Sequence, residues 1–147
     1  MRVVIQRAQY ASVTIEGQLK SKIGLGLFIL VGFEAADTVE DVQWITRKVL
    51  GLRIFDDENH VMNRSVLDVG GEILIVSQFT LFADTRSRRP GFTAAARPEL
   101  AIPLYERVIA LCRERGFTVK TGRFGADMAV ASVNDGPVTI LFDTQQA

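Results

Sequence analysis

The stretch Ile73-Leu74-Ile75-Val76-Ser77-Gln78-Phe79-Thr80-Leu81 decides the fold of this chain, because it joins a buried strand to a polar segment. The aliphatic first half, dominated by β-branched residues, is typical of a strand that is covered on both faces. The polar residues Ser77, Gln78 and Thr80 follow at once, although a globular core does not ordinarily need them. We therefore expect them to emerge where this strand reaches a sheet edge or a pocket.

More strands are predicted on the N-terminal side of this stretch. Residues 2–8 alternate loosely between apolar and polar side chains, and residues 24–33 form a continuous apolar run. Residues 11–15 and Gln18–Ile23 flank Glu16-Gly17, which predicts a β-hairpin turn. The first third of the chain is thus expected to be almost entirely strand.

Two helices are predicted, one before and one after the central strand in the sequence. Residues 38–50 carry apolar side chains at helical spacing, and residues 98–115 form a second candidate helix. In the second helix, Pro103 is expected near the first turn and Gly116 at the C-terminal cap.

The remaining strands are predicted at residues 53–55, 118–121, 128–133 and 138–142, with the last two joined across a polar corner. The pattern therefore indicates one mixed α/β domain over residues 1–147, rich in strands and with two main helices.

The composition agrees with such a domain. The chain has 147 residues, of which 48% are hydrophobic, so a core can form without a disulfide or metal staple. Cys112 is the only cysteine, which excludes an intramolecular disulfide and fits a reducing, cytoplasmic compartment. The longest apolar run, residues 23–33, is too short to span a bilayer, and Gln6 and Arg7 interrupt any signal-peptide core.

Charge limits how the protein can contact nucleic acid. The formal net charge is +0, whereas nucleic-acid binders usually carry a basic excess, so any contact must come from a local patch. The best patch is the polar loop at residues 83–97, the arginine loop, which contains Arg86, Arg88 and Arg89. These arginines either contact phosphates of an RNA or are simply solvated at the surface.

The chemistry of Ser77-Gln78-Phe79-Thr80-Leu81, the first motif, can be explained in two ways. Its polar side chains can satisfy backbone groups at a strand end, or its backbone N–H groups can hold the oxyanion formed during ester hydrolysis. Thr80 is a candidate nucleophile, but a hydroxyl needs a base, and the only histidine, His60, belongs to a different segment. The oxyanion role is therefore preferred, and no metal site is expected.

A second motif, Asn134-Asp135-Gly136-Pro137-Val138-Thr139, lies between the last two predicted strands. Pro137 stands where a strand would begin, which is unfavourable in a sheet unless the position is special. The Gly-Pro pair forms either an ordinary turn or a tight turn with a cis peptide bond.

The two motifs and their surroundings resemble the D-aminoacyl-tRNA deacylases, which hydrolyse D-amino acids from mischarged tRNA. The resemblance rests on Val4-Ile5-Gln6-Arg7 and on residues 54–58, 77–86, 121–128 and 134–139, which occur in the family's order. It covers nearly the whole chain, and the two motifs are specific as a pair. One departure is Gly91, where many relatives have a serine after the Arg-Pro pair.

The resemblance implies a deacylase-like fold, a homodimer and a chiral filter made of backbone. Each subunit is expected to insert its Gly136-Pro137, with a cis bond, into the active site of its partner. A rigid wedge near Cα would exclude an L side chain, while a D side chain points away and glycine passes. Arg7 is expected to brace the incoming Gly-Pro loop.

Catalysis in the family leans on the 2′-OH of the terminal adenosine of the tRNA and needs no cofactor. By resemblance, backbone N–H groups near Phe79 and Thr80 stabilise charge, Gln78 positions the ester, and Ser77 and Thr80 support it. Phe124 and Met128 are expected either to line the adenosine pocket or to belong to the core.

Two other functions stay open on the sequence alone. A widened pocket would make the protein an editing deacylase for tRNA that carries a wrong L-amino acid. Alternatively, the arginine loop would make it a non-enzymatic RNA- or DNA-binding protein. Hydrolysis of D-aminoacyl-tRNA with little action on L-aminoacyl-tRNA distinguishes a D-aminoacyl-tRNA deacylase from both of these alternatives.

Overall fold

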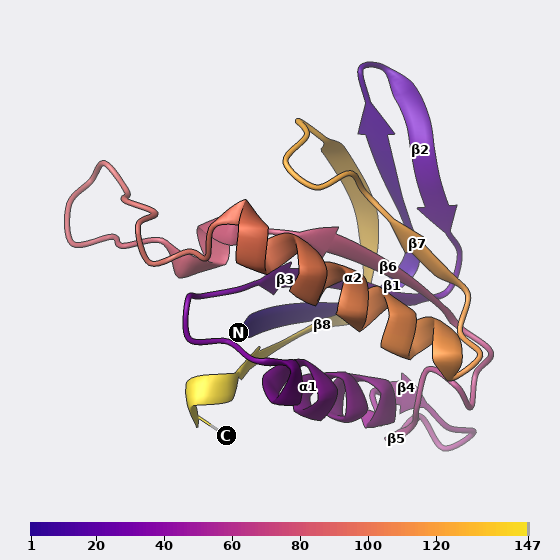
Figure 1. Cartoon of the computed structure of the whole chain (residues 1–147). Coiled ribbons are helices and arrows are strands. Elements are labelled where there is room, and N and C mark those ends of the chain that lie inside the picture. Colours follow the sequence, from indigo (N-terminus) through magenta and orange to yellow (C-terminus); the bar gives the residue numbers. More distant parts are fainter. Residues whose placement is uncertain (147) are drawn as a thin grey trace.

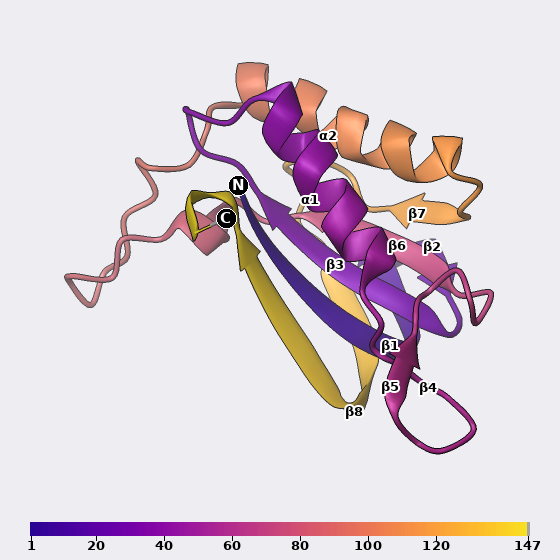
Figure 2. The ribbon, with the colours of Figure 1, turned by 90° about the horizontal axis from the view of Figure 1, so that it is seen from below.

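The computed structural model describes residues 1–146, so Ala147, the last residue of the predicted domain, lies outside them. A sheet of six strands carries two long helices on one face (Figures 1 and 2). The elements in chain order are β1 (Arg2–Ile15), β2 (Gln18–Ile23), β3 (Gly26–Gly32), α1 (Val39–Gly51), β4 (Phe55–Asp56), β5 (Met62–Arg64), β6 (Glu72–Ser77), the 3-10 turn η1 (Phe79–Phe82), α2 (Pro98–Glu114), β7 (Val119–Thr121), β8 (Ala129–Asp143) and the 3-10 turn η2 (Thr144–Gln146). This mixed, strand-rich α/β fold with two main helices is the predicted class.

The sheet is organised around β1. Its order is β2-β1-β3-β6-β7, and β8 pairs with β1 along the remaining edge. The first half of β1 lies between β3 and β8, and the second half lies between β2 and β8. Strands β3, β6 and β7 run parallel, so helical crossovers must connect them. Helices α1 and α2 make these connections and lie beside each other on the same face (Figure 2).

Both faces of the central strands are buried. On the helix face, Ile73 and Ile75 of β6 join a cluster with α1 and α2. On the other face, Leu74 and Val76 join a smaller cluster with the far half of β1 and with Phe28. This burial on both sides explains the continuous apolar run that precedes the first motif.

Several predicted strands are parts of longer ones. The strands predicted at residues 2–8 and 11–15 are one strand, β1, with irregular pairing between them. The strands predicted at 128–133 and 138–142 are likewise parts of β8, which runs through the polar corner. The short strand predicted at residues 53–55 is found slightly further along the chain, as β4. It pairs with β5, a strand that was not predicted. Hairpin residues Glu16 and Gly17 both have positive φ, as the predicted turn requires.

The two helices are confirmed, with one correction. Thr38 caps α1 through a reciprocal capping box with Asp41. Pro98, rather than Pro103, occupies the first turn of α2, and Pro103 lies within the helix. Gly116, with φ 88°, follows the cap residue Arg115, so the predicted glycine stop is close to the observed helix end.

A buried ion pair fastens the start of β1 to the segment before α1. The ammonium group of Met1 lies 2.6 Å from Asp37 Oδ1, and both side chains are fully buried. The same ammonium donates to Thr144 Oγ1 at 2.8 Å, while Asp37 also accepts from the backbone N–H of Glu34. Hydrogen bonds on both charges reduce the cost of burying them. Among residues 1–146, no helix is long and apolar enough to cross a membrane.

Candidate active site

The first motif opens into a cavity of about 320 Å³ at the end of β6. Residues 76–79 form one wall, and residues 124–128, together with Val130, form the other. The cavity thus joins two segments that are about fifty residues apart in the chain and that the sequence singled out separately. A further depression, of about 210 Å³ between α1 and α2, contains none of the predicted site residues.

The turn η1 sets the position of the motif. The backbone N–H of Gln78 donates to the carbonyl of Val31 at 2.7 Å, which anchors the turn to β3. Gly32 allows this approach, because a Cβ there would lie 2.8 Å from the carbonyl oxygen of Gln78. The Gln78 side-chain amide donates to Thr80 Oγ1. Thr80 itself is exposed and does not line the cavity.

Phe79 connects the motif to the arginine loop. Its side chain is 55% exposed, and its ring meets the ring of Phe92 edge to face with centroids 5.2 Å apart. An exposed aromatic ring at the mouth of a cavity is suited to stacking on a planar group such as a nucleobase.

The structure brings Phe124 and Met128 to the cavity, and both also support the core. The Phe124 ring lies 6.1 Å from that of Tyr105, and Met128 packs against the smaller cluster. The backbone N–H of Arg123 contacts the Met128 sulfur at 3.4 Å, which closes the loop on itself. The two predicted roles, pocket wall and core, are therefore compatible in the same side chains.

The second motif forms a corner within β8. The peptide bond between Gly136 and Pro137 is cis, and Gly136 has φ 140°. A Cβ at position 136 would lie 2.9 Å from Arg7 Nη2 and from Val138 Cγ2, so the corner has no room for a larger residue. The Asn134 side chain accepts from the backbone N–H of Val138 at 2.7 Å, which supports the turn from inside.

Arg7 holds this corner in its own chain. The side chain is about 9% exposed, with Nε donating to the carbonyl of Asp135 at 2.8 Å and Nη1 to that of Ile54 at 2.7 Å. Carboxylates of Asp56 and Asp135 lie 3.4 and 3.5 Å from the guanidinium, which compensates the buried charge. Arg7 thus contacts the Gly-Pro corner directly, although in the same subunit.

The second motif does not line this cavity within its own chain. Gly136, Pro137 and Arg7 are all absent from the lining of the cavity at the end of β6. Gly136 and Pro137 are both exposed. A corner so closely supported and yet open to its surroundings is available to an external group.

The arginine loop lies beyond η1 as an extended arm (Figure 1). Hydrogen bonds between Asp84 and Gly91 close its base. Arg86 binds Asp84 at 2.6 Å, and this ion pair lowers the pKa of Asp84 and raises that of Arg86. Arg88 and Arg89 are exposed.

Other candidate groups lie elsewhere. His60 is exposed in a turn and does not line the cavity. Burial raises the pKa of Cys112 to about 11, which leaves its thiol protonated and unreactive at neutral pH. Within residues 1–146, no group of three or more His, Cys, Asp or Glu side chains could hold a metal ion. Asp127 also lines the cavity but was not predicted from the sequence, where its place between Phe124 and Met128 was the available signal.

Comparisons with known proteins show the family of this chain. The family model for D-Tyr-tRNA(Tyr) deacylase matches residues 4–143. A protein of Parabacteroides distasonis named D-aminoacyl-tRNA deacylase is 57% identical over 99% of this chain and 98% of its own length. One of Geobacillus sp. with the same name is 52% identical over 99% of this chain and 97% of its own length.

Solved structures share the fold. One named c-Myc DNA Unwinding Element Binding Protein has a TM-score of 0.92 and 40% identity, covering 97% of this chain and 98% of that one. A probable eukaryotic D-amino acid tRNA deacylase has a TM-score of 0.82 at 19% identity, covering 96% of this chain and 97% of that one, and supports the fold alone. From the family match over residues 4–143 and the full-length relatives, we conclude that this chain belongs to the D-Tyr-tRNA(Tyr) deacylase family.

Proposed function

We propose that this protein hydrolyses the ester bond of D-aminoacyl-tRNA, releasing the free D-amino acid and tRNA. The observation that carries this proposal is the cavity that joins residues 76–79 to residues 124–128, in a chain 57% identical to a named D-aminoacyl-tRNA deacylase. Charged tRNA is a cytoplasmic substrate, so we place the activity in the cytoplasm. Residues 1–147 would act as one domain.

Catalysis is proposed to rest on the backbone and on the substrate. The N–H groups near Phe79 and Thr80 would stabilise the developing oxyanion, and one such donor typically contributes about 3 kcal/mol in the transition state. The 2′-OH of the terminal adenosine would assist attack on the ester. The exposure of Thr80, and its hydrogen bond to Gln78 rather than to a base, support this division of roles.

Selectivity is proposed to come from a second copy of the chain. In a homodimer, Gly136-Pro137 of one subunit would enter the cavity of the other and exclude an L side chain near Cα. Two observations support this: the corner is exposed, and it does not line the cavity of its own chain. Glycyl-tRNA would pass this filter, because glycine has no side chain to clash.

Contact with the tRNA is proposed along the arginine loop. Arg88 and Arg89 are exposed and can reach phosphates, whereas Arg86 is already paired with Asp84. Phe79, Phe124 and Met128 would receive the terminal adenosine, because each of them lines the cavity.

The decisive experiment compares hydrolysis of D-tyrosyl-tRNA and L-tyrosyl-tRNA by the purified protein. We expect release of D-tyrosine with little release of L-tyrosine. Equal cleavage of both esters would refute the proposed chiral filter. Cleavage of neither ester would refute the proposed activity.

A second candidate is nucleic-acid binding without hydrolysis. One observation favours it: a solved structure 40% identical to this chain is named c-Myc DNA Unwinding Element Binding Protein. Salt-dependent binding of DNA or RNA by a protein that leaves both tyrosyl esters intact would support it.

A further inference from the structure

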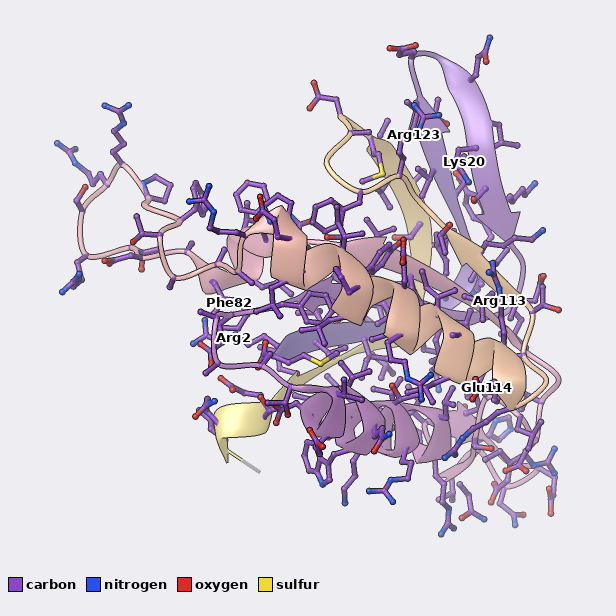
Figure 3. All side chains as sticks on the ribbon, in the orientation of Figure 1. Arg2, Lys20, Phe82, Arg113, Glu114 and Arg123 are labelled. Atoms are coloured by element: carbon purple, nitrogen blue, oxygen red, sulfur yellow. The ribbon has the colours of Figure 1, made fainter. Side chains whose placement is uncertain are left out.

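Arg2, at the start of β1, contacts three residues that belong to two separate parts of the chain. Its Nη1 donates to the carbonyl oxygen of Leu81 at 2.8 Å, and its Nε donates to Asp143 Oδ2 at 3.1 Å. The guanidinium carbon lies 4.6 Å from the centre of the Phe82 ring. Figure 3 shows Arg2 and Phe82 beside each other at the same end of the sheet.

Two of these contacts fall on η1, the turn that carries the first motif. This turn has only four residues, and its cap residue Gln78 makes no side-chain capping bond. The hydrogen bonds at its two ends are long: Leu81 N–H donates to the carbonyl of Gln78 at 3.3 Å, and Ala83 N–H donates to that of Thr80 at 3.2 Å. A single short 3-10 turn with long bonds at both ends is weakly held by itself, so contacts from outside contribute to its orientation.

The outside contacts act at opposite ends of the turn. At its start, the Gln78 N–H is held by the carbonyl of Val31 on β3. At its end, the buried ring of Phe82 and the carbonyl of Leu81 are both held by Arg2. A cation beside the last carbonyls of a helical turn also interacts favourably with its dipole.

Asp143 keeps the guanidinium in place. Its side chain is 18% exposed, against 45% for Arg2. Partial burial raises the pKa of Asp143, but the backbone N–H of Gln145 and the Arg2 side chain outweigh this and hold it below its ordinary value. The pair therefore remains charged throughout the neutral range, and it ties the turn to the end of β8.

We propose that Arg2 is a positioning residue for the deacylase reaction: it fixes η1 so that the backbone N–H groups of Phe79 and Thr80 keep the orientation that an oxyanion requires. The inference rests on the proposed function. Arg2 does not line the cavity and acts only through Leu81 and Phe82. Small errors in the position of catalytic donors are costly, because a displacement of about 1 Å can slow a reaction about 100-fold.

The test compares Arg2→Met, which removes every donor, with Arg2→Lys, which keeps the charge without the planar fork. Arg47→Met is the matched control, since Arg47 is an exposed arginine on α1 and lies outside the cavity at the end of β6. We expect Arg2→Met to lower kcat on D-tyrosyl-tRNA about 10-fold with KM within about 2-fold, Arg2→Lys to restore part of the loss, and Arg47→Met to change neither.

Amide NMR spectra of the same three variants provide a readout independent of activity. We expect the Phe79 and Thr80 N–H resonances to shift in Arg2→Met and to stay in place in Arg47→Met. Unchanged kcat, a rise in KM alone, or unshifted amides in a folded Arg2→Met would overturn the proposal. Should Arg2→Met not fold, full kcat in Arg2→Lys with unshifted amides would overturn it. Wild-type protein that cleaves neither ester would refute the proposed function, while the amide shifts would still test the role of Arg2 in orienting the turn.

Discussion

Thr80 and Thr46 are two hydroxyl-bearing residues whose surroundings lead to opposite expectations. Thr80 is exposed in η1 and accepts a hydrogen bond from the Gln78 amide. Thr46 is 3% exposed in the middle of α1, and its Oγ1 is the buried side-chain polar atom without a partner among residues 1–146. The first hydroxyl is available but not activated, and the second is buried at a cost.

Removing the Thr80 hydroxyl should leave appreciable activity. If backbone N–H groups and the RNA 2′-OH dominate, Thr80→Ala should retain single-turnover deacylation of D-tyrosyl-tRNA within about 10-fold of wild type. Replacing the terminal 2′-OH of the substrate with hydrogen should be far more damaging. A loss on the order of 10⁶-fold in Thr80→Ala, the scale seen on removing a covalent nucleophile, would contradict this expectation.

Thr46→Val should stabilise the protein. Valine has the same shape and removes an unpaired buried hydroxyl, so we expect a gain of about 1 kcal/mol in the free energy of unfolding, measured in urea. Thr38→Val is the matched control on the same helix: it deletes the capping box and should cost about 1 kcal/mol. A loss of stability in Thr46→Val would mean that the hydroxyl has a partner.

At the scale of elements, sequence patterns predicted the helices and the buried central strands better than the outer strands. The apolar runs that became β3 and β6 are buried on both faces, so burial and pattern agree there. β8 is different, because its pairing with β1 is interrupted at residues 135–138 and resumes beyond them, whereas a local pattern indicates two separate strands. Its partner, β1, lies more than a hundred residues away and is invisible to any local window.

The candidate site divides in the same way. Ser77, Gln78 and Phe79 were found because polar residues interrupt an apolar run, and Phe124 and Met128 because the family resemblance includes their segment. The contacts on which the proposed role of Arg2 rests could not be predicted in this way, because its partners Leu81 and Asp143 are distant in sequence. Tertiary contacts of this kind leave no local signal.

The pairing of β3 with β6 should depend on Gly26. A Cβ there would lie 1.9 Å from the carbonyl oxygen of Glu72, and backbone atoms cannot move aside cheaply. We expect Gly26→Ala to lower the free energy of unfolding by about 3 kcal/mol or more. Gly51→Ala is the control, since a Cβ at the end of α1 meets nothing within 4 Å and should stabilise the helix by about 0.5–1 kcal/mol. Equal effects at the two positions would contradict the parallel register.

At the scale of the whole molecule, the two faces of the sheet differ. The helices cover one face, whereas β8 exposes large apolar side chains, with Leu141 73%, Val133 42% and Val130 37% exposed. The Gly136-Pro137 corner lies on this same strand. An apolar strand that carries an exposed, closely supported corner fits the proposed contact between two copies of the chain.

Leu141→Glu should therefore disrupt self-association. We expect sedimentation velocity to show dimers for the wild type and monomers for Leu141→Glu, with deacylation lost alongside the dimer. Val39→Glu is the control, because Val39 is 44% exposed at the start of α1, and a carboxylate is favourable at a helix N-terminus. A fully active monomer would exclude a chiral filter supplied by the partner.

The pairing of β1 with β8 has a consequence for how the chain is made. Arg2 pairs with Asp143, so β1 must wait until β8 has been synthesised before its second edge is paired. Contacts of such long sequence separation slow folding, because loop closure comes before any gain in stability. During synthesis the nascent chain exposes an open strand edge, which is a template for wrong pairing. We expect co-translational folding to stop at the β3–β6 layer until β8 has left the ribosome.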